Sequence, residues 1–89
     1  MTIVLNAHEL AELDRQPAST KNNGGFQSIL VGFQERLDCA TGRITLSQRD
    51  LDRIARYAFN YRNGGWQRRL KRIFERTLGP NLGRVQRAA

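Results

Sequence analysis

The sequence has few of the residues from which catalytic and metal sites are built. Its 89 residues include one cysteine, Cys39, and one histidine, His8. A single cysteine excludes an internal disulfide, and one cysteine beside one histidine leaves no plausible protein-only zinc set. Asp38 disfavours a thiolate at its neighbour Cys39, so an idle thiol is expected rather than a nucleophile. With no Ser/His/Asp set, phosphate loop or metal-ligand spacing, we expect no enzyme, no metal or cofactor, and no small-molecule substrate.

Long apolar segments are also absent. Hydrophobic residues make up 39% of the chain, and no apolar run approaches the roughly eighteen residues of a membrane span. The apolar start, residues 1–5, is short and has no basic region before it, so a signal peptide is not expected. The chain length suits one domain with a modest core. These features predict a soluble, cytoplasmic protein without a membrane partner.

Acidic residues are scarce in the second half of the chain. Residues 1–45 hold four cations and five acids, whereas residues 46–89 hold eleven cations and three acids, for a net charge of +7 overall. Thirteen of the fifteen cations are arginine, whose guanidinium binds phosphate or carboxylate through paired hydrogen bonds. A high genomic GC content would also enrich arginine but would not cluster it. The clustering favours a polyanion or an acidic protein surface as the partner.

What the chain does contain is an internal repeat. Asn23-Gly24-Gly25-Phe26-Gln27 recurs as Asn63-Gly64-Gly65-Trp66-Gln67, and seven of the fifteen positions from 23 to 37 match their counterparts forty residues later. Upstream, Asn6 and Ser47 each follow a leucine and precede an acidic residue by three positions, which is typical of a capped helix start. The repeat predicts a duplicated unit of two helices.

Apolar spacing predicts four helices, at about residues 7–14, 25–38, 48–61 and 65–78. No segment shows sustained alternation of apolar and polar residues, so a sheet is not expected. The prediction is an all-α fold: a single helical domain over residues 1–80, built as two pseudo-repeated helical hairpins. A flexible basic tail, residues 81–89, would follow it with Arg84 and Arg87.

The two copies of the repeat differ mainly in charge. Neutral residues at 28, 29, 31 and 32 are replaced by three arginines and a lysine in the second copy. On a helical projection the face opposite the apolar stripe holds Arg68, Arg69, Arg72 and Arg76, and Lys71 and Glu75 lie at one margin of that face. Glu75 is the one acid among the five cations of this helix. A solvated helix face is the alternative interpretation. The predicted binding residues are Gln67, Arg68, Arg69, Lys71, Arg72 and Arg76, supported by Arg53, Arg56, Arg62 and Tyr57.

Some motifs in this region admit two interpretations. With Gly64 as a turn glycine, the last two helices would form a helix-turn-helix. Its second helix would then face bases and phosphates with Gln67, Arg68, Arg69 and Arg72. The same glycine pair precedes the uncharged helix at 25–38, which favours a structural turn over phosphate binding. Tyr57 falls outside the apolar stripe, among arginines, and is a candidate for stacking on a base or for filling a partner's pocket.

Part of the chain resembles a family of small proteins from proteobacterial mobile elements, some of which carry an aspartyl-tRNA synthetase label. The resemblance covers about residues 23–83 and depends on the segments Arg56-Tyr57-Ala58-Phe59, Asn63-Gly64-Gly65-Trp66-Gln67, Arg72-Ile73-Phe74 and Arg76-Thr77-Leu78-Gly79. A synthetase role is not expected, because 89 residues are too few for an aminoacylation domain. The resemblance implies an accessory gene of a mobile element.

Two functions follow as expectations. The first is a non-enzymatic, DNA-binding regulator type of protein whose basic helical face binds nucleic acid or a nucleoprotein complex. The alternative is a protein-directed inhibitor of host defence, such as an anti-CRISPR protein, that docks on an acidic surface. A homodimer whose halves pack together is a third arrangement that the sequence allows.

Overall fold

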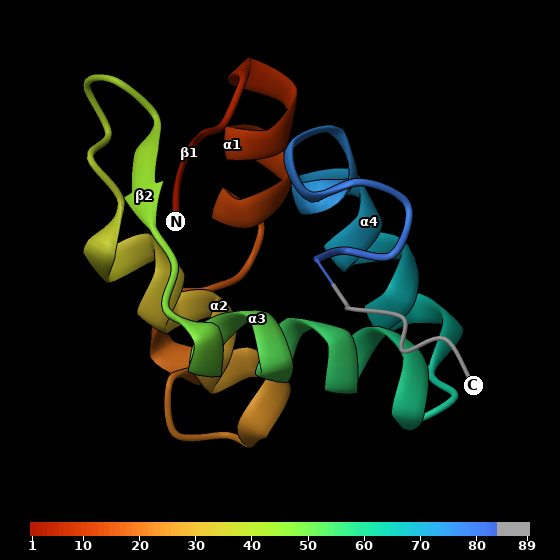
Figure 1. Ribbon diagram of the computed structural model, residues 1–89. Helices are drawn as coiled ribbons and strands as arrows, with labels where there is room; N and C mark the ends of the chain where they lie inside the picture. Colours follow the sequence, from red (N-terminus) through yellow and green to blue (C-terminus); the bar gives the residue numbers. More distant parts are fainter. Residues whose placement is uncertain (84–89) are drawn as a thin grey trace.

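The computed structural model describes residues 1–83, which form a mostly helical domain with one small sheet (Figure 1). In chain order the elements are β1 Thr2–Val4, α1 Ala7–Asp14, the 3₁₀ turn η1 Ala18–Thr20, α2 Gly25–Arg36, β2 Arg43–Thr45, α3 Gln48–Ala55, the π-helical turn η2 Arg56–Asn60 and α4 Gly64–Leu78. The four predicted helices are present near their expected positions. The predicted tail cations Arg84 and Arg87 lie outside the described residues.

The prediction that the chain has no sheet is wrong. β1 and β2 pair antiparallel, with Ile3 opposite Ile44, and both isoleucines are buried while the residues beside them are exposed. Three residues per strand are too few for side-chain alternation to stand out in the sequence. The pair places the start of the chain against the segment that leads into α3 (Figure 1, red and green).

The predicted capped helix starts are confirmed. In α1 the Asn6 side chain accepts the N–H of Glu9 at 2.9 Å, and the Glu9 carboxylate accepts the N–H of Asn6 at 2.8 Å. Ser47 and Asp50 make the same reciprocal pair at the start of α3, at 3.1 and 2.8 Å. Each acidic residue is buried, so its carboxylate needs further hydrogen-bond donors.

An arginine from a distant helix supplies that donor in each case. Arg76 on α4 donates to Glu9 at 2.7 Å, and Arg36 on α2 donates to Asp50 at 2.9 Å. Arg76 also reaches the Val4 carbonyl at 2.7 Å. The hydrogen bond with Glu9 raises the pKa of the Arg76 guanidinium above its usual value. These two ion pairs join the second helix of each repeat copy to the first helix of the other copy.

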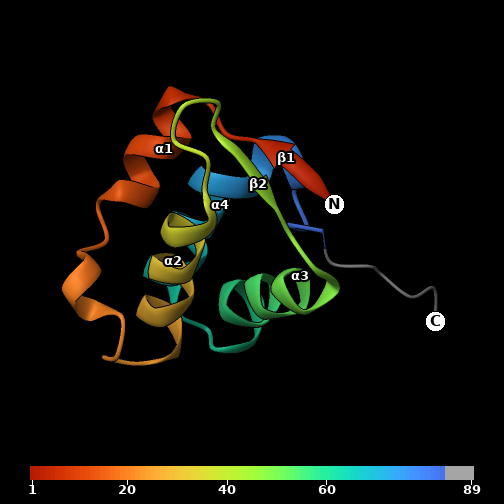
Figure 2. The ribbon, with the colours of Figure 1, turned by 90° about the vertical axis from the view of Figure 1, so that its left-hand side faces the viewer.

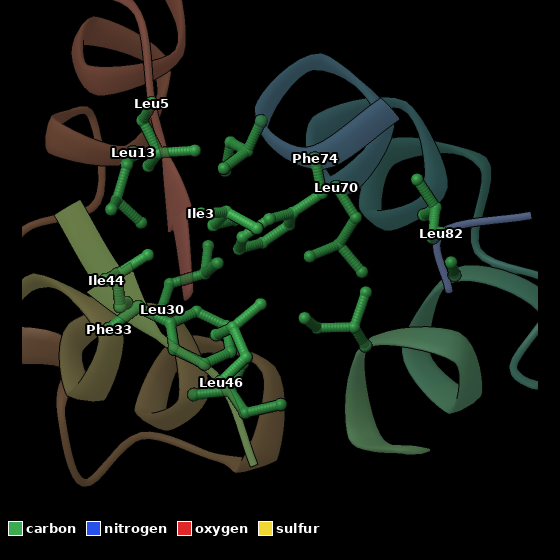
Figure 3. Packing of buried hydrophobic residues seen from close by; sticks show 14 of the residues in the cluster. Ile3, Leu5, Leu13, Leu30, Phe33, Ile44, Leu46, Leu70, Phe74 and Leu82 are labelled. Carbon is green, nitrogen blue, oxygen red and sulfur yellow. The ribbon is translucent and has the colours of Figure 1, made fainter. Parts of the chain in front are cut away.

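The helices do not form two separate hairpins, because α1 packs more extensively on α4 than on α2. All of them surround one core, in which Phe33 and Phe74 meet edge to face with ring centroids 5.5 Å apart. Figure 3 shows these rings with buried aliphatic side chains from the sheet and the helices. Leu82, expected in the flexible tail, is fully buried in this core. The packed part of the chain therefore extends past residue 80.

Replacing Asp50 by asparagine is expected to make stability less sensitive to acid. Burial by itself would raise the pKa of the Asp50 carboxyl, but hydrogen bonds from Arg36 and Ser47 outweigh it, and the pKa lies below its usual value. Such a group stabilises the fold above its unfolded-state pKa of about 3.9, and the stabilisation is lost as the pH falls through the lower folded-state value.

Urea unfolding from about pH 5 to about pH 2.5 measures this difference. Wild type should lose more unfolding free energy over that range than Asp50→Asn. Asp14→Asn is the control, because Asp14 is exposed and forms no ion pair with residues 1–83. Equal acid dependence of wild type and Asp50→Asn would contradict the assignment.

Candidate nucleic-acid interface

The N-terminus of α4 is capped by the side chain of Asn63. Asn63 Oδ1 accepts the N–H groups of Gly65 at 3.0 Å and of Trp66 at 3.1 Å. Because these donors are satisfied internally, they are not free to hold a phosphate, which supports the structural interpretation of this glycine pair.

The turn before α4 is not made by a glycine. Arg62 adopts the left-handed conformation, with φ of 54°, whereas Gly64 is already the first residue of the helix and has no positive φ. Gly64 is therefore not the turn glycine that the helix-turn-helix interpretation requires. In the first copy of the repeat the corresponding turn does use a glycine, Gly24, at φ of 142°.

Two of the five cations on α4 bond to residues of α1 or of the segment just after it. Arg69 donates to the Gln16 side chain at 2.8 Å, lies 3.9 Å from a Glu12 carboxylate oxygen, and covers the Phe26 ring with its guanidinium 5.5 Å from the centroid. Arg76 is held by Glu9 as described above. Both were expected on the solvent arc with the other cations. They lie on the flank of α4 that faces α1, so their guanidinium groups are occupied within the protein.

The remaining cations of α4 share one shallow surface depression. It is lined by Gly64, Gln67, Arg68, Lys71, Arg72 and Glu75. Arg68 and Arg72 are exposed and Lys71 is half-buried, and none of the three forms a hydrogen bond or ion pair with residues 1–83. The helix that carries them lies along one side of the molecule (Figure 1). We call these three residues the α4 basic patch.

The other predicted cations lie elsewhere. Arg53 and Arg49 line a groove whose other residues come mainly from α2, rather than the depression on α4. Figure 2 shows the helices α2 and α3 that contribute to this groove. Arg56 and Arg62 are exposed, on the π-helical turn and in the turn that follows it. The structure therefore brings together Gln67 and the α4 basic patch, and separates them from Arg53.

Tyr57 is part of an aromatic cluster rather than a free ring among arginines. Its ring lies 6.1 Å from Phe26, 5.5 Å from Trp66 and 5.0 Å from Tyr61, measured between centroids. Glycine at residue 25 leaves room for this ring, because a Cβ there would overlap the Tyr57 hydroxyl. The helix expected over residues 48–61 is α-helical only to Ala55. The chain instead makes a π-helical turn from Arg56 to Asn60, which changes the side-chain directions.

Tyr61 is the residue to which the sequence assigned no role. It is the exposed member of this cluster, with 52% of its surface accessible. Its neighbours Arg62 and Gly64 also lie at the surface. In the sequence Tyr61 is a tyrosine just before a glycine-rich turn. The periodicity of apolar residues alone does not distinguish such an exposed tyrosine from a core residue.

Comparisons with known protein families, with curated proteins and with solved structures find no match to this chain. No helix in the described part of the chain is long and apolar enough to cross a membrane. Within residues 1–83, no three His, Cys, Asp or Glu side chains gather as metal ligands would. The α4 basic patch and the nearby aromatic ring are therefore the main structural guides to function.

Proposed function

We propose that the protein is a non-enzymatic, cytoplasmic nucleic-acid-binding protein that uses the α4 basic patch. The observation that carries the proposal is the division among the cations of one helix. Arg69 is bonded to Gln16 and Arg76 to Glu9, whereas Arg68, Lys71 and Arg72 have no partner among residues 1–83 and share a depression. Phosphates bind such a cluster because each contact releases counterions from the nucleic acid.

We also infer that the two repeat copies are structural equivalents. Phe26 and Trp66, at matching positions, stack on each other at 4.9 Å with 14° between the rings. Arg36 and Arg76, also at matching positions, make the reciprocal ion pairs with the two helix caps. A duplication that preserved these contacts accounts for the residues that the copies share.

The cations of the α4 basic patch are absent from the corresponding helix of the first copy. The positions of Arg68, Lys71 and Arg72 correspond to Ser28, Val31 and Gly32 of α2, which are uncharged. Because α2 is a helix of the same domain without these cations, the fold itself does not require charge there. The charge of the second copy therefore points to a ligand outside the fold.

Equilibrium binding of the wild-type protein tests the proposal. A fluorescein-labelled DNA or RNA oligonucleotide should gain fluorescence anisotropy on titration, with affinity falling steeply between about 50 and about 200 mM salt. Recovery of nucleic acid on the protein from a host lysate, lost after nuclease treatment, would agree. Absence of binding to both DNA and RNA at about 50 mM salt would refute the proposal.

The groove between α2 and α3 favours a second candidate, a protein-directed inhibitor encoded by a mobile element, of the anti-CRISPR type. Ser28 and Gly32 lie one turn apart on α2 and form one wall. Arg49 and Arg53 line the α3 side and have no ion pair with residues 1–83. Small residues allow a second helix to approach closely, and the arginines suit carboxylates on that helix. This candidate predicts a stable, nuclease-resistant complex with one acidic protein.

Replacing Gly32 by alanine tests whether this groove is empty. A Cβ at this position would meet nothing within 4 Å, so the substitution should stabilise the protein by about 0.5–1 kcal/mol through helix propensity. Urea unfolding provides the measurement. If Gly32→Ala is less stable than wild type, other atoms of the protein already occupy the space beside Gly32, and the groove is not open there.

A further inference from the structure

Tyr61 presents a flat aromatic surface at a fixed orientation. Its ring stacks on Tyr57 at 5.0 Å with 20° between the planes, and it meets Trp66 in a T-shaped arrangement at 5.7 Å and 75°. These two contacts hold the ring in place, while 52% of the surface of Tyr61 stays accessible. An aromatic ring held in this way binds another flat group without losing much conformational freedom.

The backbone around Tyr61 departs from regular geometry on both sides. The π-helical turn ends at Asn60, immediately before it, and Arg62, immediately after it, has a φ of 54°. A left-handed conformation costs an arginine about 1–2 kcal/mol, so the rest of the fold must hold it. Strained residues and π-helical turns are both concentrated at functional sites.

Tyr61 also lies close in the chain to the helix that carries the α4 basic patch. Gly64, three residues after Tyr61, lines the depression that contains the patch, and a side chain added there would meet nothing within 4 Å. From Gly64 to Arg72 the helix rises about 12 Å, so phosphates of neighbouring nucleotides can follow the cations away from the ring. Arg62 adds an exposed cation beside the ring itself.

We propose that Tyr61 is a stacking platform for an unpaired base, and that the ligand of the α4 basic patch is therefore single-stranded nucleic acid. The inference depends on the proposed function and specifies its ligand. In a duplex the bases are already stacked on one another, so a side chain on the protein surface cannot stack on them without disrupting the helix. A single strand offers every base to an aromatic ring while its phosphates meet the arginines.

The test uses three labelled probes of about fifteen nucleotides, a length within the range of single-strand binding sites. One is a single strand of deoxythymidine, one is a duplex, and one is an abasic strand with the backbone alone. Tyr61→Ala should weaken binding of the thymidine strand by about tenfold, because stacking of one base contributes on that scale. Its binding of the duplex and the abasic strand should change by less than about twofold.

Tyr61→Phe is the matched control, since it keeps the ring and removes only the hydroxyl. It should bind the thymidine strand like wild type. Circular dichroism establishes that each variant is folded. The proposal is overturned if Tyr61→Ala binds the thymidine strand as tightly as wild type, or weakens the abasic strand equally.

A measurement on unaltered protein covers the case in which Tyr61→Ala does not fold. Trp66 is the chain's only tryptophan and touches Tyr61, so its fluorescence reports on this surface. The thymidine strand should quench Trp66 more than the abasic strand does, and equal quenching would overturn the proposal. Equal binding of the thymidine and abasic strands would end this inference alone, whereas failure to bind all three probes and an RNA strand of the same length would end the proposed function.

Discussion

Replacing Arg68, Lys71 and Arg72 together by alanine is expected to weaken nucleic-acid binding about 10- to 100-fold at moderate salt. Each cation contributes a modest, exposed contact to a phosphate, and three such contacts multiply in the binding constant. Folding should be unaffected, because alanine is a strong helix former and the three side chains make no ion pair with residues 1–83. Fluorescence anisotropy with a labelled single strand measures the change.

Two matched variants separate this effect from overall charge. Removal of three exposed cations elsewhere, Lys21, Arg43 and Arg49, changes the net charge equally and should weaken binding by less than about threefold. Glu75→Gln removes an acid from the depression itself and should strengthen binding. If the two triple variants lose affinity equally, binding depends on net charge and not on the α4 basic patch.

Replacing Gly42 by alanine is expected to destabilise the protein by about 3 kcal/mol or more, the largest effect of a single substitution that we predict. Gly42 has a φ of 75°, and a Cβ there would overlap the backbone carbonyl oxygen of Leu5. That carbonyl cannot move freely, because the Leu5 N–H donates to the Gly42 carbonyl at 2.9 Å next to the β1–β2 pair. Urea or thermal unfolding measures the loss.

Gly79→Ala is the control for backbone strain alone. Gly79 has a similar φ of 87° after the last residue of α4, but a Cβ there would meet nothing within 4 Å. It should cost about 1–2 kcal/mol, the strain of a left-handed residue. Equal losses of unfolding free energy for the two variants would show that the close approach of residue 42 to the Leu5 carbonyl adds no cost beyond backbone strain.

The helices could be predicted from the sequence because their information is local. Asn6 and Ser47 mark helix starts through contacts that span three residues, and the apolar spacing that follows repeats within each turn. The sheet could not be predicted, because Ile3 and Ile44 meet across forty-one positions in strands of three residues. The π-helical turn has no comparable pattern, so the direction of Tyr57 was misjudged.

The sequence was sufficient to predict which helix is basic, but not which of its cations are free to bind a ligand. Clustering in the sequence identified α4 as the basic helix. It did not show that Arg69 and Arg76 bond to Gln16 and Glu9, since those partners lie more than fifty residues away. Arg76 recurs as Arg36 because both close a helix cap, which explains their identity in the repeat without reference to a ligand.

The repeat therefore contains two classes of residue. Shared residues, such as the stacked pair Phe26 and Trp66, hold the domain together. Residues that differ, above all the α4 basic patch, are those we propose to bind the ligand. Tyr61 and its turn lie between the two helices of the second copy, and we propose that this ring contacts the same ligand.

The most direct test of the central claim is the salt dependence of oligonucleotide binding, compared between wild type and the triple variant of Arg68, Lys71 and Arg72. The slope of log affinity against log salt decreases by about 0.7–0.9 for each phosphate contact removed, depending on whether the probe is single- or double-stranded. We predict that the variant's slope is shallower than wild type by about 2 to 3. Coincident slopes would contradict the account, because the patch would then touch no phosphate.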